Sequence, residues 1–207
     1  MPTKWNRGVR ETGQLKIYNK AGGWSAAVDA AIGSFNNLGL GVQLVTERDE
    51  TAANVVVVVA NSAAENYPHG TYLATIPPNK FKPEELHGFA WTRASSTRSN
   101  RPVEIDFAVV FLPGRVANPT PKQKEVIVVH ELIHASGLNG GLPNGSDAPN
   151  KDHDSEGIMY PQMAVAGDGL IEYLHEKDTS PMSPIRVGVK TRCAMRMLWS
   201  DADCKSN

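Results

Sequence analysis

The sequence predicts an α+β fold in which a sheet is covered by two main helices. Gln14–Tyr18 alternates polar and apolar residues, which is typical of a half-buried strand. Asn54–Ala60 is apolar almost throughout, so we expect a central strand covered on both faces. Trp24–Leu38 has apolar residues at helical spacing, with Ser25 as the candidate N-cap and Gly39 as the stop. These three patterns predict a sheet with a helix packed on it.

The other expected elements follow from the same periodicities. Further strands are predicted at Val42–Val45, Gly88–Thr92 and Val103–Leu112. A second main helix is predicted after Pro119-Thr-Pro121, ending at Gly137, and a closing helix over Ser183–Trp199. The segments rich in Gly, Pro, Asn and Ser are expected to be long loops, namely Asn61–Pro83 and Asn139–Gly157.

Chain length and net charge limit the number of domains and the classes of binding partner that we expect. A chain of 207 residues is long enough for one sizeable core, so we expect a single domain over 1–207. It has 21 basic and 22 acidic residues and a net charge of -1, which argues against nucleic acid or acidic lipid as a partner. The longest apolar run, Val55–Ala60, is far shorter than the roughly 20 residues of a membrane-spanning helix. We therefore expect a soluble protein.

Two further features bear on the compartment. No apolar segment follows the basic residues of the N-terminus, so no secretory signal is expected, and the localisation stays open. Cys193 and Cys204 are the only cysteines, and their spacing allows either a small disulfide loop or two thiols.

The second main helix carries the motif His130-Glu-Leu-Ile-His134. Side chains four residues apart lie on one helix face, so both imidazoles can reach one ion. Zinc suits two imidazoles, and a catalytic zinc site has three protein ligands and a position for water. Glu131, next to the first ligand, can take a proton from the activated water and pass it to a leaving amine. The motif predicts metal-assisted hydrolysis with Glu131 as general base.

A second motif follows in the order expected of one enzyme family. The stretch His130-Glu-Leu-Ile-His-Ala-Ser-Gly-Leu138 resembles the active-site helix of the metzincin metallopeptidases, and Gly157-Ile-Met-Tyr-Pro161 resembles their Met-turn. The resemblance implies a mixed, mostly parallel twisted sheet. It also implies an N-terminal subdomain, 1–138, that ends in the active-site helix, and a smaller C-terminal subdomain, 139–207.

The third zinc ligand departs from the metzincin pattern. The family has a third histidine three residues after the turn glycine, and this sequence has Gly140 there. His153 is the favoured replacement, because it is the only histidine between the helix and Met159. The implied insertion is similar to that of leishmanolysin, whereas the rest looks like a matrixin. Aspartates could complete the site instead, namely Asp147, Asp152 and Asp154. The remaining histidines are expected to be surface or core residues, namely His69, His87 and His175.

The resemblance also gives expectations for the pocket and the substrate. Met159 is expected to lie beneath the metal, with Tyr160 and Pro161 leading into a substrate pocket. An extended peptide is expected to pair with an exposed edge strand, for which Gly88–Thr92 or the preceding loop is the candidate. The acidic run around Asp154 weakly resembles a calcium loop.

Three functions are compatible with these residues. A zinc endopeptidase is favoured. An amidase or endopeptidase acting on peptidoglycan peptides would use the same chemistry. A non-catalytic, zinc-stabilised binding module is disfavoured by Glu131, because a structural zinc site has no use for a base.

Overall fold

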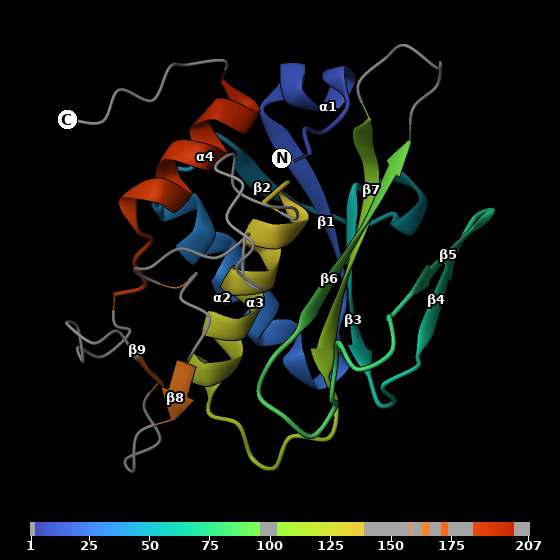
Figure 1. The fold of residues 1–207 in the computed structure, drawn as a ribbon, viewed down its shortest axis with the longest axis vertical. Coiled ribbons are helices and arrows are strands. Elements are labelled where there is room, and N and C mark those ends of the chain that lie inside the picture. The colour runs from blue at the N-terminus through green and yellow to red at the C-terminus, as the bar shows by residue number, and fades with distance from the viewer. Residues whose placement is uncertain are drawn as a thin grey trace.

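A computed structural model describes residues 3–95, 103–138, 158, 163–165, 171–173 and 184–200 of the chain. Its centre is a five-stranded sheet with the order β2-β1-β3-β7-β6 (Figure 1). The strands are β1 (Gln14–Lys20), β2 (Gln43–Glu47), β3 (Val55–Ala60), β6 (Phe89–Ser95) and β7 (Glu104–Pro113). Four of these run parallel, and β6 pairs antiparallel with β7 at one end of the sheet. The predicted mixed, mostly parallel sheet is confirmed.

The alternation of side chains along β3 divides the interior into two clusters. Val55 and Val57 belong to the larger cluster, shared with the helices, whereas Val56 and Val58 belong to a smaller cluster on the opposite face. Both sets are buried, which is why this strand reads as a continuous apolar run. The predicted central position of the strand is confirmed, because it lies between β1 and β7.

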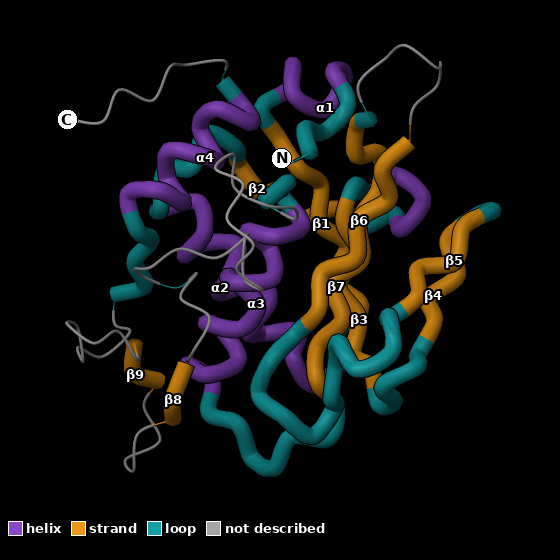
Figure 2. The backbone as a smooth tube through the Cα atoms, in the orientation of Figure 1, coloured by secondary structure: helices purple, strands orange, loops and turns teal. Residues whose placement is uncertain are grey.

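The helices that follow the first strand lie together on one side of the sheet, and a small hairpin lies on the other (Figures 1 and 2). The helices are α1 (Arg7–Thr12), α2 (Ser25–Asn37), α3 (Pro121–Ala135) and α4 (Val189–Trp199), with short 3-10 turns at Gly22–Trp24 and Glu50–Ala52. The last two strands, β8 (Met163–Val165) and β9 (Ile171–Tyr173), pair antiparallel with each other. Within the described ranges, no helix has the length and apolar character needed to cross a bilayer.

The prediction of a long loop over Asn61–Pro83 is wrong in its middle. Strands β4 (Asn66–His69) and β5 (Tyr72–Thr75) form an antiparallel hairpin whose turn contains Gly70 at φ 55°. Tyr67 and Ala74 bury their side chains against the outer face of the sheet. Pro68 and Gly70 weaken the local strand pattern, so packing on the sheet decides the structure here.

Two helix boundaries also differ from expectation. Ser25 is the first helical residue rather than the N-cap, because the 3-10 turn leads directly into α2 and Trp24 holds the cap position. The closing helix begins only at Val189, with Gly188 as its N-cap. Ile185 is buried outside the helix, where Pro184 and Gly188 disfavour helical continuation.

Candidate metal centre

The helix α3 begins at a capping box, which fixes where the motif falls in space. The Thr120 hydroxyl accepts a hydrogen bond from the Gln123 backbone N–H at 3.2 Å. The Gln123 side chain accepts one in return from the Thr120 N–H at 2.8 Å. Pro121 occupies the first turn, where its missing N–H costs nothing. The predicted start of the helix is confirmed.

The motif residues lie on the buried part of α3. The helix packs against α2, β6 and β7. His130, Glu131 and His134 are 7%, 5% and 8% exposed, respectively. Polar side chains at this depth need specific partners, because an unsatisfied buried group costs free energy.

The two histidines turn the same ring nitrogen toward each other. His130 Nε2 and His134 Nε2 are 3.2 Å apart. Each Nδ1 faces a backbone carbonyl, Ile158 O at 2.8 Å for His130 and Leu138 O at 2.6 Å for His134. A carbonyl only accepts, so each Nδ1 carries the proton, and in the neutral ring each Nε2 then presents a lone pair.

This donor pair fits a zinc ion. Two lone pairs 3.2 Å apart repel unless a cation or a proton lies between them. Two nitrogens bound tetrahedrally to one zinc at about 2.0–2.1 Å would be roughly 3.3–3.4 Å apart, close to the observed separation. Metal-binding histidines also commonly donate their second N–H to a backbone carbonyl, as both rings do here. His130 and His134 are therefore suited to hold zinc.

Two tryptophans from opposite ends of the chain contact the end of α3. The indole Nε1–H of Trp5 donates to Ala135 O at 3.0 Å, and that of Trp199 donates to Ser136 O at 3.0 Å. Both bonds are buried. The last carbonyls of a helix have no partner within the helix, so these indoles supply the missing donors. Sequence reasoning did not assign either residue to the site, because no local pattern marks such a long-range contact.

The turn after α3 links the end of the helix, where the two tryptophans bind, to the ring of His134. Gly137 has φ 119°, and a Cβ there would be 2.9 Å from Thr3 O and 3.4 Å from a methyl of Leu198. Glycine is therefore required for both its conformation and its close contacts. The turn brings Leu138 O to His134 Nδ1, so the contacts that hold the turn also orient the imidazole.

We expect Trp5→Phe and Trp199→Phe each to lower the free energy of unfolding by about 1–3 kcal/mol, because a buried carbonyl loses its donor. Each is also expected to weaken zinc binding about tenfold through the orientation of His134. Denaturant unfolding and zinc titration measure the two effects. Trp24→Phe is the matched control, since Trp24 is also buried but lies at the start of α2. Equal zinc affinity in all three variants would contradict the role of the turn.

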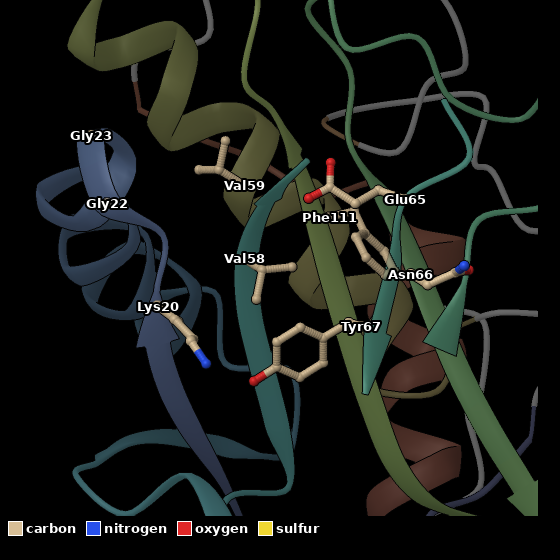
Figure 3. Close-up of a pocket in the computed structure, with 9 residues that line it drawn as sticks. All are labelled: Lys20, Gly22, Gly23, Val58, Val59, Glu65, Asn66, Tyr67 and Phe111. Carbon is tan, nitrogen blue, oxygen red and sulfur yellow. The ribbon is translucent and has the colours of Figure 1, made fainter. Parts of the chain in front are cut away.

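A separate cavity of about 400 Å³ is lined by Lys20, at the end of β1, and by Tyr67 of β4 (Figure 3). The Tyr67 hydroxyl donates to the Glu50 carboxylate, which also accepts from Lys20 Nζ at 3.1 Å. Burial, and then this hydrogen bond, raise the pKa of Tyr67, while the same bond lowers the pKa of Glu50. Tyr67 thus stays protonated at neutral pH. Neither His130 nor His134 lines this cavity, so it is separate from the metal centre.

Several predicted site residues lie outside the described residues. They are His153, its alternatives Asp147, Asp152 and Asp154, the residues Met159, Tyr160 and Pro161, and His175. Within the described part of the chain, no group of three or more His, Cys, Asp or Glu residues could hold a metal ion. Cys193, on α4, is disulfide-bonded, and Cys204 also lies outside the described residues.

The two other described histidines contact residues outside the His-Glu-x-x-His motif. His69 stacks on Phe107 with the ring centroids 3.8 Å apart. The ring centroid of His87 lies 5.6 Å from that of Phe81, and His87 Nδ1 lies 3.9 Å from Oε2 of Glu85. These contacts agree with the expectation that both are ordinary surface or packing residues.

No protein-family model and no curated protein sequence matches the chain. Among solved structures, the chain is similar to high choriolytic enzyme 1, a hatching enzyme zinc-protease from Oryzias latipes (medaka fish). The similarity has a TM-score of 0.38 and 14% sequence identity, over 95% of this chain and 93% of the other.

Proposed function

We propose that this protein is a zinc-dependent endopeptidase. The observation that carries the proposal is the pair of buried Nε2 atoms, 3.2 Å apart, on the helix that also holds the buried carboxylate of Glu131. A site that only stabilised the fold would need no adjacent base. The sequence motifs further support assignment to the metzincins, matrixin-like with an insertion before the third ligand.

His130 and His134 would hold the zinc ion, and His153 is the proposed third ligand. A zinc ion held there supplies Lewis acidity, which polarises a peptide carbonyl and lowers the pKa of a water toward about 7. The two carbonyl partners fix the tautomer of each imidazole, so that both Nε2 atoms remain available. Met159, Tyr160 and Pro161 are proposed to form the floor and wall of the adjoining pocket.

Glu131 is the proposed general base. Its carboxylate would take a proton from the attacking water and deliver it to the nitrogen of the leaving amine. The residue is adjacent to His130 in the sequence and only 5% exposed, which limits competition from bulk water. No covalent intermediate with the protein is needed.

An extended peptide is the proposed substrate. β6 is the terminal strand of the five-stranded sheet and packs against α3. A terminal strand has backbone N–H and C=O groups that can pair with another extended chain. This arrangement favours β6 as the strand that aligns the substrate beside Glu131. The strand contains most of the predicted segment Gly88–Thr92.

Metal removal tests the proposal directly. We expect the purified chain to contain about one zinc ion and to cleave dye-labelled denatured casein, because zinc supplies the electrophile. A chelator should abolish cleavage, and added zinc should restore it. Zinc content is measured by elemental analysis alongside the cleavage assay. Tightly bound zinc without cleavage of casein or of peptidoglycan peptides would instead indicate a binding module.

A further inference from the structure

Gly88, immediately before β6, has no room for a side chain. A Cβ atom at this position would lie 2.5 Å from Cγ of Glu131, 3.0 Å from its Cδ and 3.1 Å from Phe111 O. Contacts under 3.0 Å do not occur without displacement of one of the partners. The φ of Gly88 is outside the left-handed region, so glycine is required here for space rather than for backbone conformation.

The surroundings of Gly88 determine which neighbouring group an added side chain would displace. Phe111 belongs to β7, which is paired with β3 on one side and with β6 on the other, so its carbonyl is fixed in the sheet. Glu131 reaches Gly88 through rotatable side-chain bonds, which can adjust more easily than a hydrogen-bonded strand. A methyl group at Gly88 would therefore displace the Glu131 carboxylate rather than the strand.

The two imidazoles are not among the three atoms closest to that Cβ position. Their orientations are set elsewhere, by Ile158 O and Leu138 O. A side chain at Gly88 would thus affect the proposed base while leaving the proposed metal ligands in place.

We propose that Gly88 is a positioning residue for Glu131. Its missing side chain lets the carboxylate of the general base lie directly against the backbone that leads into the edge strand, where the substrate would pair. This inference rests on the proposed function, since it assigns Glu131 a proton-transfer role. It adds a requirement for glycine at a position outside the His-Glu-x-x-His motif.

The test is a double-mutant cycle of Gly88→Ala and Glu131→Ala. Alone, Gly88→Ala should lower the thermal midpoint by about 5 °C, retain zinc, and reduce kcat on dye-labelled casein about 100-fold or more. In the Glu131→Ala background, which lacks Cγ and Cδ, the same substitution should shift the midpoint by less than about 2 °C. Crowding against a group other than Glu131 would not produce this coupling, and the loss of kcat separates a positioning role from a purely structural one.

Gly114→Ala is the matched control. A Cβ there would be 2.2 Å from Asn61 Oδ1 and 2.7 Å from a methyl of Val59, so it is at least as crowded but does not touch Glu131. It should lower the thermal midpoint while retaining kcat and showing no coupling to Glu131→Ala. Loss of kcat to the same extent in Gly114→Ala would overturn the specific role of Gly88.

The outcomes separate this inference from the proposed function. Cleavage at the wild-type rate by Glu131→Ala would contradict the general-base role of Glu131. It would also contradict the positioning role of Gly88, which depends on it. Loss of cleavage in Glu131→Ala together with wild-type kcat in Gly88→Ala would overturn the positioning role alone. Equal destabilisation by Gly88→Ala in both backgrounds would also overturn it, because the crowding would then involve another group.

Discussion

Replacement of Glu131 by glutamine is expected to reduce kcat by about 10²–10⁴-fold while zinc remains bound. The amide has nearly the same shape as the carboxylate but cannot accept a proton from water at neutral pH. His130 and His134 keep their carbonyl partners, so the metal should remain at about one ion per chain. Elemental analysis and steady-state cleavage of dye-labelled casein measure the two quantities on the same preparation.

Stability provides a second readout for this variant. Glu131 is 5% exposed, and glutamine has nearly the same volume and can also form hydrogen bonds, so the thermal midpoint of the glutamine variant should stay within about 5 °C of wild type. Glu125→Gln is the matched control on the same helix. Glu125 Oε2 is 3.0 Å from Lys122 Nζ, away from the histidine pair, and this variant should keep its kcat. A wild-type kcat in the Glu131→Gln variant would contradict the proposed mechanism.

The elements with strong local signals were predictable from the sequence. The capping residues around Pro121 and the four-residue spacing of His130 and His134 fix the start of α3 and one shared face. The continuous apolar run of β3 likewise predicts its central place in the sheet. In each case, the residues that determine the local structure lie within a few positions of one another in the sequence.

Features set by distant contacts could not be predicted in this way. The donors to the end of α3 are Trp5 and Trp199, which are 130 and 63 residues away from their partners. The space at Gly88 is taken by Glu131, on another element. The hairpin β4–β5 forms because its apolar side chains pack on the sheet, which overrides its weak local pattern. Only the three-dimensional arrangement reveals these dependencies.

The second large effect is expected from loss of a zinc ligand. His130→Ala and His134→Ala should each weaken zinc binding by more than about 100-fold, beyond the 10–100-fold typical when only a supporting residue is changed. Cleavage should fall to background in both variants. Zinc titration followed by the cleavage assay measures this, and His153→Ala in the same series should behave likewise if it supplies the third donor. Unchanged affinity in His153→Ala would favour one of the aspartates.

The effect of zinc on stability shows whether the metal binds where the geometry places it. A ligand that binds only the folded state stabilises it, by about 2.7 kcal/mol when its concentration is 100 times Kd. Added zinc should therefore raise the unfolding midpoint of wild type and of His69→Gln, since His69 is stacked on Phe107 rather than directed at the histidine pair. It should not raise the midpoint of His130→Ala or His134→Ala. Without metal, the two alanine variants should be less stable than wild type by about 1–3 kcal/mol, because each leaves a buried backbone carbonyl without its donor. A zinc-induced shift of equal size in every variant would place the metal elsewhere and contradict the assignment of these histidines.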